Sequence, residues 1–167
     1  MKRYLLLIVL IINGILAQAQ WTKIFYLDDF GDTTDIFFIE VESFDGLTYY
    51  NDPNTKPLDK FCVKIVIDED KNVGFFMYEN CAFEKNAYPG TSPFKEGTFR
   101  MRNSEGTTVK VNILGKFAKS GGLKLESDKF REFLTDSNGD IRCILKVGVA
   151  YHKFTLDATG YQKVIGK

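Results

Sequence analysis

The stretch FCVKIVIDEDKNVGFFMY, residues 61–78, decides the fold. Its first half alternates, with Phe61, Val63, Ile65 and Ile67 on one side and more polar residues between them. This period of two predicts a half-buried strand over 61–67. The charged turn 68–72 and an aromatic run over 73–78 complete a β-hairpin. We expect the first strand to bury Val63, Ile65 and Ile67, and the second to bury Phe75 and Met77.

Similar short runs, separated by turn residues, continue on both sides of this hairpin. The loop over 28–35 and the dipeptide Asp45-Gly46 are interpreted as turns. Val109, Val111 and Ile113 are further inward positions. The pattern predicts an all-β fold, mainly an antiparallel β-sandwich or partly open barrel. Strands are expected over 23–27, 36–44, 47–50, 61–67, 73–78, 97–101, 107–114, 123–126, 141–149 and 151–156.

One short helix is predicted near 128–135. Ser127 is a suitable cap, and Asp128 would face the positive end of the helix dipole. Phe130, Phe133 and Leu134 fall at i, i+3 and i+4, which makes one apolar stripe. We expect this stripe to pack the helix against a sheet or against a barrel end.

The N-terminus has the pattern of a secretory signal peptide. Lys2 and Arg3 precede an apolar run, and Ala17-Gln18-Ala19 offers small residues for cleavage before Gln20. The run is shorter than the ~20 residues that a membrane span needs. The sequence therefore predicts a signal peptide over 1–19 and a single β-sandwich-like domain over 20–167. The protein is expected to be secreted or periplasmic, with no stable membrane anchor after cleavage.

Charge and composition narrow the class of partner. Removing residues 1–19 takes away Lys2 and Arg3 and no acid, so a formal charge of zero becomes −2. Without a basic excess or an obvious basic stripe, the chain is not expected to bind nucleic acid, and a polyanion or an anionic membrane is also disfavoured as a partner. Fifteen Phe and eight Tyr predict an aromatic β core, or alternatively a groove for a small apolar ligand.

Four carboxylates gather in the segment 28–35, at Asp28, Asp29, Asp32 and Asp35. Such a loop can bind Ca²⁺, which prefers six to eight oxygen ligands. It can also supply the acid and base of glycoside hydrolysis, or form a solvated acidic turn. His152 is the only histidine, and nothing around it matches a hydrolase nucleophile motif. No catalytic residue and no cofactor are assigned, and these four aspartates are the metal candidates.

Cys62, Cys81 and Cys143 are an odd number of thiols for an exported chain. A hairpin register in which partner numbers sum to 143 places Cys62 opposite Cys81, within disulfide range. Cys62 with Cys143 is the competing pair, if the strand over 141–149 neighbours the strand over 61–67. Three free buried thiols are the third possibility.

The mature chain resembles a recurrent type of small secreted β protein of Bacteroidetes-like bacteria. The resemblance depends on the order of several motifs, of which Trp21 and Phe30-Gly31-Asp32 come first. It continues through the hairpin and the Phe/Leu-rich helix, and ends in Phe154-Thr155-Leu156-Asp157-Ala158-Thr159-Gly160-Tyr161. The resemblance implies a fold and a location outside the cytoplasm, and no activity.

The absence of a catalytic motif favours a non-enzymatic module that binds a protein or glycan at the cell envelope or outside the cell. Two alternatives remain: a hydrolase that uses the carboxylates of the 28–35 loop, and a carrier of a small apolar ligand. Buried carboxylates facing each other in a cleft would favour the hydrolase, and a splayed, exposed loop would favour binding.

Overall fold

The computed structural model describes residues 21–79, 97–117 and 122–166. In these ranges the chain forms ten strands and two helices. The strands are β1 (Thr22–Leu27), β2 (Thr33–Tyr50), β3 (Asp59–Ile67), β4 (Val73–Glu79), β5 (Thr98–Arg102), β6 (Thr108–Val111), β7 (Ile113–Phe117), β8 (Gly122–Leu125), β9 (Asp140–Val147) and β10 (Ala150–Asp157). The helices are α2 (Ser127–Asp136) and α3 (Ala158–Ile165).

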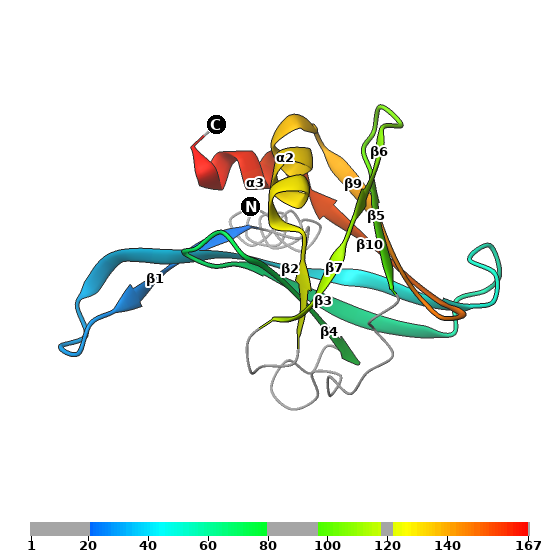
Figure 1. The fold of residues 1–167 in the computed structure, drawn as a ribbon, viewed down its shortest axis with the longest axis horizontal. Coiled ribbons are helices and arrows are strands. Elements are labelled where there is room, and N and C mark those ends of the chain that lie inside the picture. The colour runs from blue at the N-terminus through cyan, green and yellow to red at the C-terminus, as the bar shows by residue number, and fades with distance from the viewer. Residues whose placement is uncertain (1–20, 80–96, 118–121, 167) are drawn as a thin grey trace, which may run out of the picture.

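The strands form one antiparallel, nearly closed, barrel-like sheet (Figure 1). Its order is β6-β5-β9-β10-β2-β3-β4-β8-β7, with β1 attached to β2. The two ends of this order, β6 and β7, are consecutive segments separated only by Asn112. One bent stretch of chain therefore pairs with β5 through its first half and with β8 through its second. The predicted all-β fold is confirmed, in its barrel form.

The core follows the predicted alternation. Residues 63, 65, 67, 75, 77 and 111 are buried, whereas Val109 and Ile113 are only partly buried against the core. The middle of the barrel is filled by phenylalanine rings from β4, β5 and β10. Phe75 lies 5.7 Å from Phe99 and 5.5 Å from Phe154 between ring centroids, and Phe99 lies 6.0 Å from Phe154. These rings pack against one another.

The turn predicted at Asp45-Gly46 is wrong, because β2 runs unbroken through it. The register of β2 against β3 shifts between Ser43 and Gly46, which marks a β-bulge. A Cβ at Gly46 would lie 2.5 Å from the Phe61 carbonyl oxygen, so only glycine permits this close approach. The dipeptide Asp45-Gly46 therefore marks a β-bulge within one strand rather than a turn between two strands.

A hairpin projects from the barrel. Residues 33–38 of β2 pair with β1, and β3 joins β2 only from Ile39 onward. We call residues 22–38 the arm. Figure 1 shows it extending well beyond the barrel.

Helix α2 occupies the predicted place. Phe130 and Leu134 are buried as expected, but Phe133 is only partly buried. The N-cap is Glu126 rather than Ser127. The Ser127 hydroxyl instead accepts a hydrogen bond from the Val73 backbone N–H at 3.1 Å, which ties the helix start to β4.

Helix α3 was not predicted, and it holds the N-terminal end of the arm. Trp21 donates a hydrogen bond from Nε1 to the Asp157 carbonyl at 2.7 Å, and its ring lies 5.0 Å from that of Tyr161. A Cβ at Gly160 would lie 3.3 Å from the Trp21 ring. The first and last motifs of the resemblance thus meet in space, and we call this contact the Trp21 clamp.

Candidate functional site

The four aspartates lie at the arm tip and on its β2 strand, and all four are exposed. Asp28 Oδ1 accepts hydrogen bonds from the backbone N–H groups of Phe30 and Asp32, both at 2.9 Å, so its carboxylate shapes the turn. Across the described ranges, no three Asp, Glu, His or Cys side chains are grouped as metal ligands. The loop has the splayed, exposed form that favours binding over hydrolysis.

His152 and Cys143 each have a structural partner. The His152 Nδ1 and the Thr48 hydroxyl are hydrogen-bonded at 3.1 Å, and burial lowers the pKa of His152 to about 4. Cys143 is a free, buried thiol that donates to the Ile141 carbonyl at 3.8 Å. Burial raises the pKa of this thiol well above its usual range, which is the opposite of what a nucleophile needs.

The register of the β3–β4 hairpin differs from the predicted one. Cys62 lies opposite Tyr78, and partner numbers sum to 140 rather than 143. The Cys62–Cys143 pair is wrong, because Cys143 is free, and β10 and β2 separate its strand from β3. Cys81 lies outside the described residues, so its pairing with Cys62 stays a prediction.

The barrel carries a set of cations on the outer face of four adjacent strands, and the rows that they form continue onto a fifth strand. Sheet pairing aligns them in three rows across β6, β5, β9, β10 and β2. The rows are Thr108–Arg102–Arg142–Thr155, Lys110–Arg100–Ile144–Lys153–Leu47 and Thr98–Lys146–Tyr151–Tyr49. We call the six cations and two tyrosines of these rows the basic face.

These cations have little competition from acids. No ion pair joins any of the six to a carboxylate within the described part of the chain, where the pairs involve Lys64, Lys129 and Arg131. Asp45 borders the face, but its carboxylate accepts hydrogen bonds from the Thr155 N–H at 3.1 Å and from the Ser43 hydroxyl. The positive charge of the face is therefore available to a ligand.

Two lysines are held against tyrosine rings. The Lys153 ammonium lies 4.5 Å from the centroid of the Tyr49 ring and donates to the Pro53 carbonyl at 2.6 Å. The Lys146 ammonium lies 5.1 Å from the centroid of the Tyr151 ring. Cation–π contacts at exposed sites are worth about 0.5–1 kcal/mol, so they favour these positions of the two charges on the face.

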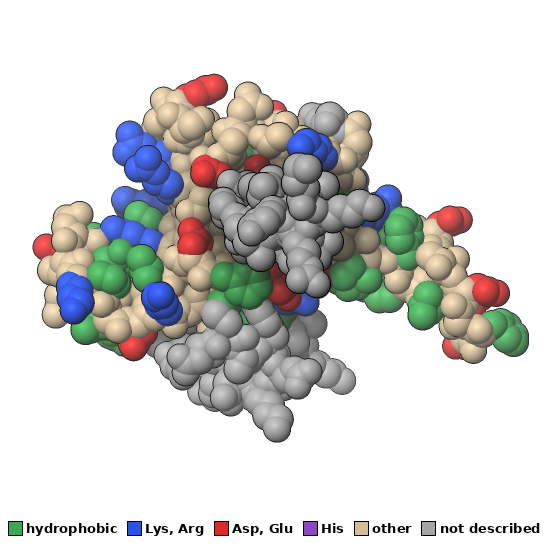
Figure 2. All heavy atoms as spheres, turned by 180° about the vertical axis from the view of Figure 1, so that it is seen from behind, with side chains coloured by type: hydrophobic (Ala, Val, Ile, Leu, Met, Phe, Trp, Pro, Cys, Tyr) green, Lys and Arg blue, Asp and Glu red, His purple; other side chains and the backbone are tan. Residues whose placement is uncertain are grey.

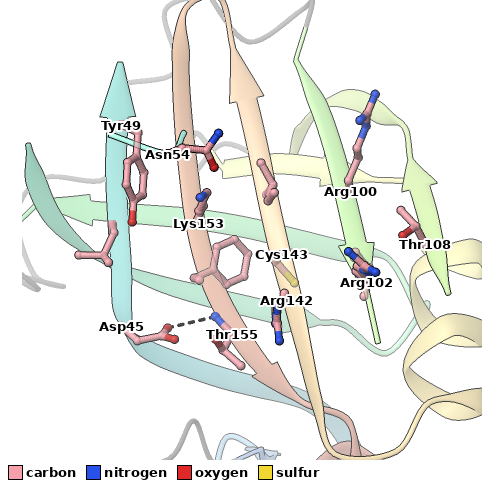
Figure 3. Close-up of a pocket in the computed structure, with 14 residues that line it drawn as sticks. Asp45, Tyr49, Asn54, Arg100, Arg102, Thr108, Arg142, Cys143, Lys153 and Thr155 are labelled. Carbon is pink, nitrogen blue, oxygen red and sulfur yellow. Dashed lines mark hydrogen bonds between the residues drawn. The ribbon is translucent and has the colours of Figure 1, made fainter. Parts of the chain in front are cut away.

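A pocket of about 620 Å³ opens on the basic face. Figure 3 shows Tyr49, Asn54 and Lys153 toward one side of it and the arginines from β5 and β9 toward the other. Leu47 and Ile144 add apolar surface. The pocket thus combines positive charge at its rim with an apolar floor, which suits a ligand that carries both anionic and apolar groups.

Sequence reasoning missed this face, and the expectation of no basic stripe overlooked it. Strands β5 and β9 contribute two cations each, β6 and β10 contribute one each, and inward-facing residues separate the cations along the sequence. Arg100-Met101-Arg102 is the one local hint, because alternation places both arginines on the same side of a strand. The rest of the face depends on which strands are neighbours, and that order is not readable from spacing.

Comparison with protein-family models, with curated proteins and with solved structures found no match to the chain. In the described ranges, no helix is long and apolar enough to cross a membrane.

Proposed function

We propose that the protein is an exported, non-enzymatic binding module whose ligand is an acidic glycan at the cell envelope or outside the cell. The observation that carries this proposal is the basic face, where six cations share one surface with two tyrosines and have no ion-pair partner among the described residues.

The chemistry of the face favours a uronic acid polymer. Arg100, Arg102 and Arg142 present planar guanidinium groups, which bind carboxylates through two parallel hydrogen bonds. The apolar face of a sugar ring can pack on Leu47 and Ile144. The chain has no overall basic excess, and its cations are concentrated on one face. Such a face suits a short anionic segment of a polymer.

The first prediction tests this ligand class. Replacing Arg100, Arg102 and Arg142 together by serine should weaken binding of polygalacturonate by more than about 100-fold, because each charge-assisted hydrogen bond contributes ~1.5–3 kcal/mol. Isothermal titration calorimetry with the mature chain measures the effect. All three side chains are exposed, so the thermal midpoint should not change.

The control variant is Lys163→Glu, a charge reversal on α3, which should bind as the wild type does. Neutral dextran should not bind. Tighter binding of single-stranded DNA than of polygalacturonate would overturn the proposal in favour of nucleic acid. Equal binding by the triple variant and the wild type would show that the basic face is not the site.

The second prediction concerns export and the disulfide. Protein recovered from outside the cytoplasm should have the mass of a chain that begins at Gln20. After alkylation in denaturant without reductant, it should carry a single label, on Cys143, if Cys62 and Cys81 are paired. Intact-mass measurement reads both properties. Three labels would reject the disulfide, and a mass that includes residues 1–19 would reject cleavage.

A further inference from the structure

We propose that the arm of one copy inserts its tip into the pocket on the basic face of another copy, so that the protein assembles head to tail into chains. This inference goes beyond glycan binding and does not depend on it. The arm and an acidic glycan would compete for the same arginines.

The arm exposes several large apolar side chains to solvent. Phe30 at the tip is 92% exposed and Leu27 is 65% exposed. Phe25, Tyr26 and Ile36 are also exposed large hydrophobic residues of the arm. A two-stranded ribbon is marginally stable in water, and exposed apolar groups gathered on a projection mark an interaction surface. The arm therefore has the composition of an element that is covered in its working state.

The arm and the pocket have opposite charges. Residues 22–38 contain four aspartates and one cation, Lys23. The pocket is lined by Arg100, Arg102, Arg142 and Lys153, with Asp45 as its one carboxylate among the described residues. Complementary charge of this kind steers association and sets its register. The apolar floor of Leu47 and Ile144 offers the Phe30 ring a surface to cover.

The two surfaces lie at opposite ends of the molecule. In Figure 1 the arm extends to one end of the longest axis, and the strands of the basic face lie toward the other. Figure 2 shows acidic and hydrophobic side chains along the arm, and Lys and Arg side chains gathered at the opposite end.

This separation excludes insertion of an arm into its own pocket. Strand β2 supplies both the arm and Tyr49 of the pocket, and its run from Thr33 to Tyr49 spans roughly 50 Å at ~3.3 Å per residue. A contact between two copies leaves one arm and one pocket free. Repetition of this head-to-tail contact produces open chains, or rings where the rotation between copies closes.

The mature protein should therefore self-associate in sedimentation velocity experiments. At low salt the mean mass should rise with concentration, and high salt should return it to the monomer. Phe30→Ala should weaken association about 10- to 100-fold, which is the range expected for burial of one phenylalanine side chain. Arg142→Glu should abolish association. Leu58→Ala removes another exposed apolar side chain, one outside the arm, and Lys163→Glu reverses a charge on α3, so both should associate as the wild type does.

A mixing experiment distinguishes this contact from any other. A tip-blocked double variant, Asp29→Lys with Phe30→Ala, keeps an intact pocket, and Arg142→Glu keeps an intact arm. Each variant alone should be monomeric, and the mixture should form one-to-one dimers and nothing larger. A monomeric mixture, or a wild type that is monomeric at every concentration in low salt, would overturn the inference. Retained polygalacturonate binding by the wild type and by the tip-blocked variant, whose arginines are intact, would leave the proposed function standing.

Discussion

Replacing Phe99 by alanine should lower the free energy of unfolding by about 3–5 kcal/mol. The Phe99 side chain is fully buried, at 0% exposure, and touches rings from three other elements. Besides Phe75 and Phe154, its ring lies 6.1 Å from that of Phe130, so it links helix α2 to the sheet. The packed rings around it cannot close the space that the missing ring would leave. The variant therefore loses the free energy of burying the ring and also incurs the cost of the cavity.

Thermal unfolding followed by circular dichroism measures this effect. The midpoint should fall by roughly 6–20 °C, since ~1 kcal/mol shifts a domain of this size by ~2–4 °C. Phe30→Ala is the matched control, because the same substitution at the exposed tip should change the midpoint very little. A midpoint for Phe99→Ala equal to that of Phe30→Ala would show that the barrel interior is assigned wrongly.

Removing the Trp21 clamp should have the second large effect, also about 3–5 kcal/mol for Trp21→Ala. The Trp21 side chain is 3% exposed, so alanine would leave a cavity beside Tyr161. The Asp157 carbonyl would also lose the hydrogen bond that it accepts. Because β1 begins at the next residue, we expect Trp21→Ala to destabilise the arm more than the rest of the barrel.

Hydrogen exchange measures where the damage falls. Backbone amides of β1 should exchange faster in Trp21→Ala by a larger factor than those of β9, which lies in the barrel wall. Trp21→Phe keeps most of the ring but cannot donate, so it should cost only about 0.5–1.5 kcal/mol, the net contribution of one hydrogen bond. Uniform acceleration across both strands would mean that Trp21 stabilises the whole barrel rather than the arm.

Local pattern was enough for the elements whose neighbours in sequence are also neighbours in space. The β3–β4 hairpin and helix α2 are of this kind, because alternation and the Phe130–Leu134 spacing report directly on which side is buried. Even in the β3–β4 hairpin the predicted register was wrong, because the numbers of paired residues sum to 140 rather than 143. The turn over 68–72 sets that register, and Asp68 defines the turn by accepting from the Asn72 N–H at 2.7 Å.

The Gly46 bulge, helix α3 and the basic face could not be predicted, because each depends on contacts between segments that are distant in the sequence. Gly46 permits a bulge only because Phe61 approaches it from β3, so its role is invisible without the pairing. Helix α3 is short and has few helix signals of its own. Its buried residues, Ala158 and Tyr161, become informative only when Trp21 is known to lie against them. The basic face likewise exists only after β5, β9, β10 and β2 are placed side by side.

The place of β2 in the sheet has a consequence for the order of folding. Its later half pairs with β10, so that Leu47 lies opposite Lys153, near the end of the chain. Contacts between such distant segments are slow to form, and domains rich in them fold in milliseconds to seconds. A growing chain that lacks its last strands leaves the final residues of β2, 47–50, without their partner strand β10. In a chain that is exported as we propose, this delay would keep the polypeptide unfolded during translocation.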